Sequence, residues 1–259
     1  MTAAGGTNDG QRPAARPLTA RSVVLSLLLG AHPPELPVRD IVRTVGLFDI
    51  SEATLRVALS RMVGAGDLDR RDGTYRLTRR LLERQARQDD ATHPSTLPWR
   101  GDWEIAVVTS VGRSAADRAE LRTRLSELRL AELREGTWLR PANLVRSWPV
   151  ELGGLVRRFS ARPEDDAAEL AAQLWDLPGW AATTEALLEH LATTSDPADK
   201  FTTAAAAVRH LLRDPVLPPE LLPPAWPAAN LRRRYTAYQA ELTRLLLVTQ
   251  LHNRQVLEA

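Results

Sequence analysis

The stretch ISEATLRVALSRMVGAGDLDRRDGTYRLT, residues 50–78, decides the fold of the N-terminal part of this chain. A serine that suits a helix N-cap precedes apolar residues at helical spacing, which predicts a helix over residues 51–65. Two extended runs at 67–71 and 74–78 then flank an Asp-Gly pair at 72–73, a dipeptide that favours a tight hairpin turn. The stretch therefore predicts a helix followed directly by a β-hairpin.

Two more helices are predicted on the N-terminal side of this stretch. The first covers residues 19–29 between a threonine N-cap and a glycine, and the second covers residues 37–45 and also ends at a glycine. A short turn at 47–50 separates the second helix from the helix over 51–65. Two helices joined by a turn with glycine are the helix-turn-helix signature, and the hairpin behind them is the wing. We therefore predict a winged helix-turn-helix DNA-binding domain over residues 17–88.

The helix over residues 51–65 has two faces of different chemistry. At 100° per residue, Leu55, Leu59 and Met62 share one face, which we expect to pack on the preceding helices. The opposite face and the hairpin carry side chains that can contact bases or phosphates. The predicted DNA contacts are Ser51, Thr54, Arg56, Val57, Ser60 and Arg61 on the helix and Arg70, Arg71 and Arg76 on the hairpin.

Basic residues are concentrated in one segment of the chain. The formal net charge is only +2, yet residues 56–87 hold nine arginines against four acidic residues. A local basic segment is expected of a nucleic-acid surface, but a solvated face with ion pairs explains the same composition. Two alternatives to a DNA-binding regulator therefore stay open: a winged-helix protein-interaction module without DNA binding, and an enzyme of unknown chemistry.

The remainder of the chain divides into a tail, a linker and two further domains. Residues 1–16 lack apolar periodicity and are expected to form a disordered tail, and residues 89–98 form a polar, proline-marked linker. All seven tryptophans lie beyond this linker, which indicates separately built cores. Residues 99–163 are predicted to form a ferredoxin-like domain and residues 164–259 a helical C-terminal domain. The predicted fold class is α+β and helix-rich.

The elements of these two domains follow from periodicity and proline positions. In the central domain, strands are expected at 103–109, 137–139 and 155–160, with a helix that begins at Ser114. The C-terminal helices are predicted at residues 166–175, 183–193, 200–212 and 231–251. Six prolines before the last helix predict a stiff, extended connector.

Several classes of protein are disfavoured by composition. The chain has no cysteine, which excludes disulfides, thiolate metal sites and a cysteine nucleophile. No stretch has the roughly 18 apolar residues of a membrane span, and the apolar run at 23–31 fits a helix better than a secretory signal. The five histidines lack metal-ligand spacing and are interpreted as surface or linker residues. We expect a cytoplasmic protein with no catalytic residues, no metal and no cofactor.

The sequence resembles the PaaX family of bacterial transcriptional regulators across nearly the whole chain after the tail. The matching pieces are the stretch at 50–78, WRGDWEIAVV at 99–108, LREGTWLRPANL at 133–144, LWDL at 174–177 and PVLPPELLPPAWPAANLRRRY at 215–235. Each piece alone is weak, but their ordered series is specific.

The resemblance implies a homodimer on a pseudo-palindromic DNA operator and repression that a small-molecule effector releases. In founding members of the family the effector is an aryl-CoA thioester, phenylacetyl-CoA, so an acyl-CoA or aromatic effector is expected. Arg232, Arg233 and Arg234 are candidate contacts for CoA phosphates, with a solvated helix face as the alternative. The central domain also resembles the small CRISPR adaptation nucleases. Thr109 stands where those nucleases carry a metal-binding acid, so nuclease activity is not expected.

Overall fold

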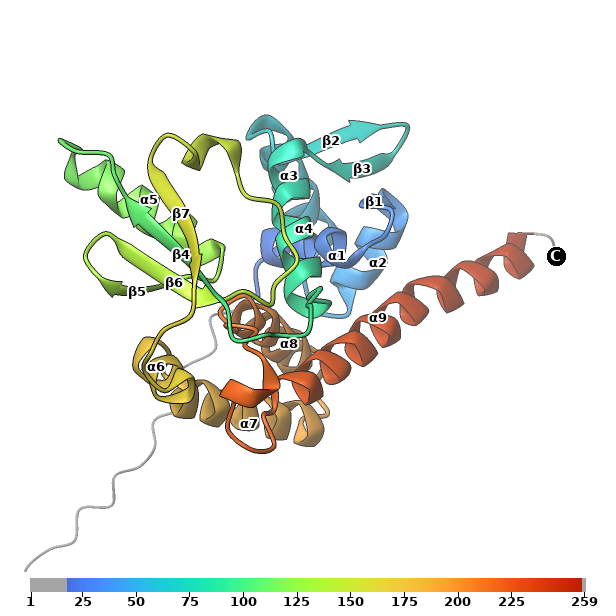
Figure 1. The fold of residues 1–259 in the computed structure, drawn as a ribbon. Helices are drawn as coiled ribbons and strands as arrows, with labels where there is room; N and C mark the ends of the chain where they lie inside the picture. The colour runs from blue at the N-terminus through green and yellow to red at the C-terminus, as the bar shows by residue number, and fades with distance from the viewer. Residues whose placement is uncertain (1–17, 258–259) are drawn as a thin grey trace, which may run out of the picture.

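The structure is a computed structural model that describes residues 18–257, with side chains described through residue 244. Figure 1 shows three parts in chain order: a winged helix, a four-stranded sheet with helices against it, and a set of C-terminal helices. This arrangement confirms the predicted α+β, helix-rich fold class. The tail predicted at residues 1–16 lies outside the described residues.

The N-terminal part contains three helices and a small sheet. Its elements are α1 Ala20–Gly30, β1 Glu35–Pro37, α2 Val38–Gly46, α3 Glu52–Gly64, β2 Leu68–Arg71 and β3 Thr74–Leu77. The strands pair antiparallel in the order β1-β3-β2. Buried residues of α1 meet Ile41, Leu55 and Leu59 in one apolar core. The predicted winged helix-turn-helix is confirmed, and β1 adds a strand that the sequence analysis did not predict.

Local signals in the sequence account for these boundaries. A capping box at Thr19 begins α1. The hydroxyl of Ser51 accepts a hydrogen bond from the backbone amide of Thr54 at 3.2 Å, which satisfies a free amide at the start of α3. Asp72 and Gly73 have φ values of 49° and 74°, the left-handed backbone that a two-residue hairpin turn requires.

A fourth helix, α4 Arg79–Thr92, was not predicted from the sequence. Helix α4 extends to Thr92, whereas residues 89–98 were expected to form a linker. The predicted linker is therefore helical over residues 89–92. The buried face of α4 is partly polar, and Gln85 donates to the backbone carbonyls of Leu29 and Ala31 at 3.2 and 2.9 Å. Gln85 thereby satisfies carbonyls left free at the end of α1. Because glutamines stand at inward positions, a search for apolar periodicity misses this helix.

The central part is an antiparallel sheet of ferredoxin-like topology. Its elements are β4 Trp103–Val108, α5 Ala115–Glu127, β5 Ala131–Arg134, β6 Thr137–Pro141, η1 Val150–Leu152 and β7 Val156–Ala161. The strand order β5-β6-β4-β7 confirms the predicted topology. Strand β5 was not predicted, and the short 3₁₀ helix η1 stands where a ferredoxin-like fold has its second helix. Leu121 and Leu125 of α5 pack on one face of the sheet, and Leu170 packs on the other.

The C-terminal part is helical, as predicted. It consists of α6 Ala167–Leu174, α7 Leu177–Thr193, α8 Pro197–Leu211, η2 Pro219–Leu221 and α9 Ala228–Leu257. Helix α7 begins before the predicted 183–193 because Asp176 caps it. The proline-rich connector between α8 and α9 is non-helical apart from η2, and its residues Val216 and Leu217 are buried. Figure 1 shows the C-terminal half of α9 projecting beyond the other helices; no described helix is long and apolar enough to cross a membrane.

Arg140 joins the central sheet to the proline-rich connector. Its fully buried side chain donates to the Val216 carbonyl at 3.2 Å and to Oδ1 of Asn143 at 2.9 Å. Asn143 donates to the same Val216 carbonyl at 3.1 Å. Burial, with the nearby charges of Arg146 and Arg129, lowers the pKa of Arg140 to about 9. Arg140 and Asn143 both belong to the LREGTWLRPANL piece, so this motif holds two parts of the molecule together.

The winged helix and α4 are joined to the C-terminal helices mainly by apolar and neutral contacts, and Arg232 of α9 adds a hydrogen bond to the Ala91 carbonyl of α4. Phe48 packs against Phe201 with ring centroids 4.9 Å apart. Gln88 on α4 donates to the hydroxyl of Tyr235 on α9 at 2.8 Å. Within the described part of the chain, no ion pair crosses between the winged helix and the C-terminal helices.

Candidate nucleic-acid interface

Helix α3 presents the predicted outer face to solvent. Its buried side is formed by Leu55, Leu59 and Met62, which pack in the core of the winged helix. The residues on its exposed side are Ser51, Thr54, Arg56, Val57, Ser60 and Arg61. Val57 is 52 % exposed although it is apolar, and an apolar side chain in this position can contact a thymine methyl group. The structure therefore brings the six residues together on one surface of suitable chemistry for a DNA groove.

The two arginines on this surface are held differently. Nε of Arg56 donates to Oε1 of Glu52 at 2.8 Å, one turn earlier on the helix. An exposed pair of this kind contributes about 0.3–0.5 kcal/mol, so a stronger partner can displace it. Arg61 is exposed and has no ion-pair partner among the described residues. Arg61 can therefore reach a base or phosphate directly, whereas Arg56 must first leave Glu52.

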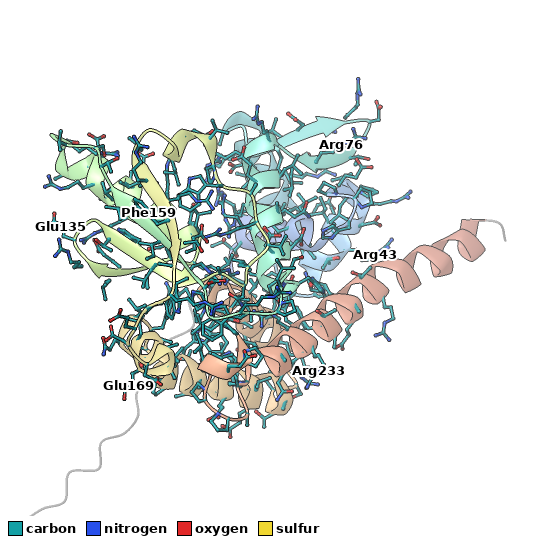
Figure 2. All side chains as sticks on the ribbon, in the orientation of Figure 1. Arg43, Arg76, Glu135, Phe159, Glu169 and Arg233 are labelled. Carbon is teal, nitrogen blue, oxygen red and sulfur yellow. The ribbon has the colours of Figure 1, made fainter. Side chains whose placement is uncertain are left out.

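Arg76 on the wing is already engaged. It lies opposite Glu35 on β1 and Asp69 on β2, so that acidic residues occupy both neighbouring strands. Nε of Arg76 lies 2.6 Å from a carboxylate oxygen of Glu35. Figure 2 places Arg76 on the wing strands. Part of its charge is thus compensated within the protein, which weakens the prediction that it contacts DNA.

Arg70 and Arg71 are the more available wing residues. The guanidinium of Arg70 lies over the ring of Tyr75, 5.8 Å from its centroid. Tyr75 itself is buried, in agreement with its interpretation as a core residue of the hairpin. Arg71 is exposed at the end of β2 beside the turn and has no ion-pair partner in the described residues. Its position suits contact with a phosphate backbone.

Asp67 fixes the wing to the rest of the domain, a role that the sequence analysis did not assign. Its side chain is 1 % exposed, lies 2.7 Å from the guanidinium of Arg21 on α1, and also accepts from Arg80 on α4. Its backbone amide donates to the Met62 carbonyl at 2.9 Å, and its carbonyl accepts from the amide of Thr78 at 3.2 Å. Asp67 therefore connects the hairpin to three helices. Arg80, one of the arginines counted in the basic segment, is largely exposed but pairs with the buried Asp67 and so supports the wing within the protein.

The three arginines predicted to bind an effector do not converge. Arg232 is paired with Asp214 and also donates to the Ala91 carbonyl at the end of α4, at 3.0 Å. Arg234 donates to a backbone carbonyl of α7 at 3.1 Å. Arg233 points to solvent, as Figure 2 shows. Two of the three thus stabilise contacts between helices and do not share a binding surface with the third.

His210 is not the surface residue that the sequence analysis expected. Its ring stacks on Trp180 with centroids 4.4 Å apart, and its Nε2 lies 3.0 Å from the hydroxyl of Thr184. Burial lowers the pKa of His210, which favours the neutral ring. The described residues contain no group of three His, Asp or Glu side chains that could hold a metal ion. Thr109, which was expected to be the last residue of the strand at 103–109, directly follows the end of β4.

The fold and the exposed surface of α3 define a class of protein. Its members have several domains, of which the N-terminal one is a winged helix with arginines on its outer face. Within this class, the chain belongs to the PaaX family. Three family models match it, described as PaaX-like protein at residues 19–81, PaaX protein central Cas2-like domain at 96–154 and PaaX-like protein C-terminal domain at 169–246. The resemblance inferred from the sequence is confirmed. The family is one of transcriptional regulators and not of enzymes, so membership supports a regulatory role.

A solved structure shares the whole architecture. It is described as uncharacterized protein Rv0674 from Mycobacterium tuberculosis, and it is 49% identical in sequence, with a TM-score of 0.80. The match covers 90% of this chain and 99% of that one. No protein of curated function matches the chain.

Proposed function

We propose that this protein is a sequence-specific DNA-binding regulator that places α3 in the major groove of an operator. The observation that carries the proposal is the exposed face of α3, where Arg61 has no ion-pair partner among the side chains that the structure describes and Val57 and Ser60 lie on the same side. An arginine can contact guanine through two hydrogen bonds, and a valine can contact thymine. The wing then lies along the phosphate backbone, with Arg71 as its most available contact.

The protein binds a pseudo-palindromic operator as a homodimer. One α3 reads only a few base pairs, and two copies on one face of the DNA multiply the recognition. The two half-sites are then about 10–10.5 base pairs apart from centre to centre, or a multiple of this distance. Sedimentation with DNA of two half-sites tests the stoichiometry, and binding of a single copy to the full operator would contradict this part of the proposal.

The regulator acts as a cytoplasmic repressor that an acyl-CoA or aromatic effector releases from DNA. The phosphates of CoA require cationic side chains. A cleft of about 900 Å³ between α4 and the central part offers more of them than the α9 arginines do. Five arginines and two acids line this cleft: Arg84, Arg87, Arg124, Arg129 and Arg146, with Asp90 and Glu127. Arg124 and Arg146 are paired with glutamates and Arg129 donates to a backbone carbonyl, whereas Arg84 and Arg87 have no ion-pair partner among the described residues. Burial, with repulsion from Arg21, Arg87 and Arg209, lowers the pKa of Arg84, and of these three arginines Arg87 also lines the cleft.

A gel-shift experiment with the DNA upstream of the protein's own gene tests the proposed function. We expect specific retardation, with release by one compound from a panel of acyl-CoA esters and free aromatic acids. Arg84→Ala should weaken release by a CoA ester and leave DNA binding intact, whereas the exposed Arg134→Ala serves as a matched control. Absence of retardation at low salt would instead favour a protein-interaction module.

A further inference from the structure

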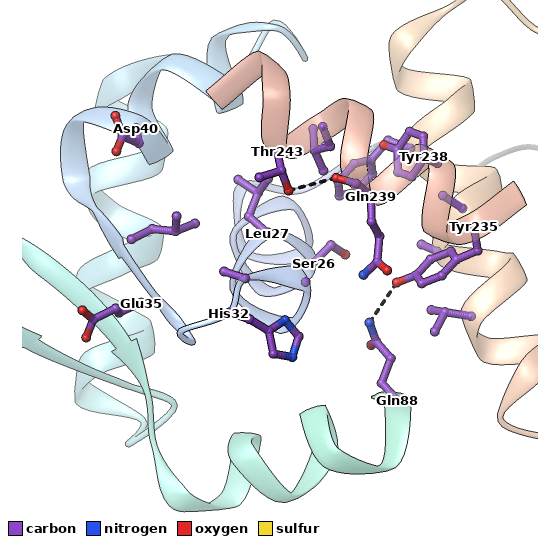
Figure 3. Close-up of a pocket in the computed structure, with 18 of the residues that line it drawn as sticks. Ser26, Leu27, His32, Glu35, Asp40, Gln88, Tyr235, Tyr238, Gln239 and Thr243 are labelled. Atoms are coloured by element: carbon purple, nitrogen blue, oxygen red, sulfur yellow. Dashed lines mark hydrogen bonds between the residues drawn. The ribbon is translucent and has the colours of Figure 1, made fainter. Parts of the chain in front are cut away.

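A second cavity lies at the joint between the winged helix and the C-terminal helices. Its volume is about 430 Å³, within the range of small-molecule sites. One wall comes from the winged helix, through α1, β1 and α2, and the other from α8 and α9; Gln88 of α4 lies between them (Figure 3). Well-packed interiors leave few voids larger than a water molecule. A space of this size between two packed bodies is therefore an opening that a ligand can fill.

The lining combines apolar walls with neutral hydrogen-bonding groups. The apolar side chains include Leu27, Leu36, Phe201, Val208 and Leu242. Figure 3 shows Ser26, Gln239 and Tyr235 directed toward the same space between α1 and α9. Burial raises the pKa of Tyr235 and of Tyr238, so both phenols stay uncharged at neutral pH and can donate hydrogen bonds. A flat, uncharged ring with a polar substituent matches these walls.

The charges around the cavity disfavour an anion. None of the described residues that line it is an arginine or a lysine, and the one histidine, His32, has its Nε2 3.0 Å from a carboxylate oxygen of Asp89. Its acids are Glu35, which is paired with Arg76 at 2.6 Å, and Asp40, which has Arg43 at 3.7 Å. A buried anion without a cationic partner is strongly disfavoured. The cavity therefore differs in kind from the arginine-lined cleft beside α4.

We propose that this cavity binds an uncharged aromatic small molecule and that its occupancy changes the affinity of the protein for DNA. The second half of this inference rests on the proposed function. The cavity contacts β1, and Leu36 of β1 pairs with Tyr75 of the wing strand β3. It also contacts α2, the first helix of the helix-turn-helix. A ligand between the two walls changes the position of the winged helix relative to α8 and α9. It thereby changes the orientation of the exposed face of α3 toward DNA.

A matched pair of fluorescent probes tests the ligand class. N-phenyl-1-naphthylamine is uncharged, and 8-anilino-1-naphthalenesulfonate has nearly the same rings with an added sulfonate. In titrations of the full chain without DNA, we expect saturable binding of the uncharged probe and at least about tenfold weaker binding of the sulfonate. Equal binding of both probes, or no saturable binding of the uncharged one, would overturn the proposal.

Cavity-filling variants locate the probe. Ala205→Phe on α8 should weaken binding of the uncharged probe by about tenfold or more, because Ala205 lines the cavity. Ala206→Phe is the matched control, since Ala206 is the next residue on the same helix, is equally half-buried, and does not line the cavity. Ser26→Phe fills the space from the opposite wall and replaces the first variant if its circular dichroism shows unfolding. Unchanged probe binding in the folded filling variants would place the probe elsewhere and overturn the proposal.

The effect on DNA is measured separately, by anisotropy of labelled operator DNA. Saturation with the uncharged probe should change the dissociation constant for DNA by about fivefold or more in the unmodified protein and in Ala206→Phe, but not in Ala205→Phe. An unchanged constant would overturn the regulatory half of the inference. If the protein retards no DNA at all, the proposed function fails while the probe titrations still decide whether the cavity is a ligand site.

Discussion

The arginines of the winged helix and those of the joint between the central and C-terminal parts are one residue type in two kinds of surroundings. Arg61 is exposed on α3 and has no ion-pair partner among the described residues. Arg140 is fully buried and donates to a carbonyl and an amide oxygen. Because Arg61 is solvated, it is available to an anionic partner. Because Arg140 is buried, its hydrogen bonds stabilise the fold. A basic composition therefore does not reveal a binding surface until each arginine is placed.

The largest effect of a substitution is expected at the buried arginine, Arg140. Arg140→Ala removes the donors to Val216 and Asn143 and leaves a cavity, so we expect a loss of about 3–5 kcal/mol in the free energy of unfolding. Urea unfolding measures this change. Arg134→Ala, an exposed arginine on β5, should change stability by less than about 0.5 kcal/mol. Equal losses in the two variants would remove the distinction between buried and exposed arginines.

Arg61→Ala tests the role of the exposed arginine on α3. We expect operator binding to weaken by about 1–3 kcal/mol if Arg61 reads a base, with little change in stability. Arg56→Ala should cost less, because Arg56 must give up its pair with Glu52 before it contacts DNA. Anisotropy with operator and with random DNA separates the two roles. An equal loss on both kinds of DNA would show that Arg61 contacts only phosphate.

Asp67 lies between the two extremes, because it is a buried acid with two largely exposed arginine partners. Asp67→Asn keeps the size of the side chain and removes its charge, and we expect a loss of about 1–2 kcal/mol in stability. Faster hydrogen exchange at the amides of β2 and β3 should accompany this loss. Asp69→Asn on the exposed side of β2 is the control. Undisturbed exchange in the hairpin would show that Asp67 does not hold the wing in place.

The smallest effect is expected on the wing. Arg71→Ala should lower the slope of DNA affinity against salt concentration by about one unit, as expected for one lost phosphate contact. Arg76→Ala should lower it less, because Glu35 already pairs with Arg76. Measurements of the dissociation constant at several salt concentrations give both slopes. The reverse order would mean that DNA displaces Glu35 and that Arg71 faces solvent in the complex.

The parts of the fold that depend on local signals could be predicted from the sequence. The Asp72-Gly73 turn, the Ser51 cap and the apolar face of α3 each require only neighbouring residues, and all three are confirmed. Helix α4 was missed because its inward Gln85 and Gln88 find their partners on distant elements. The spacing of apolar residues along a helix gives no information about hydrogen-bond partners on distant elements.

The same limit applies to the candidate sites. The outer face of α3 could be predicted because it lies on a single helix. The pairing of Arg232 could not be predicted because its partner Asp214 is contributed by another segment, and in the sequence Arg232 is simply one of three adjacent arginines. The cavity at the joint is lined from five helices and one strand, so no local pattern could reveal it.

The absence of ion pairs between the described residues of the winged helix and those of the C-terminal helices has a practical consequence. Phe48 on Phe201 and Gln88 on Tyr235 carry no net charge, whereas DNA contacts through arginine depend on ionic strength. Raising the salt concentration should therefore elute the protein from a DNA column while its parts stay assembled. Eluted molecules would be ready to bind again after simple dilution, with no refolding step between capture and reuse.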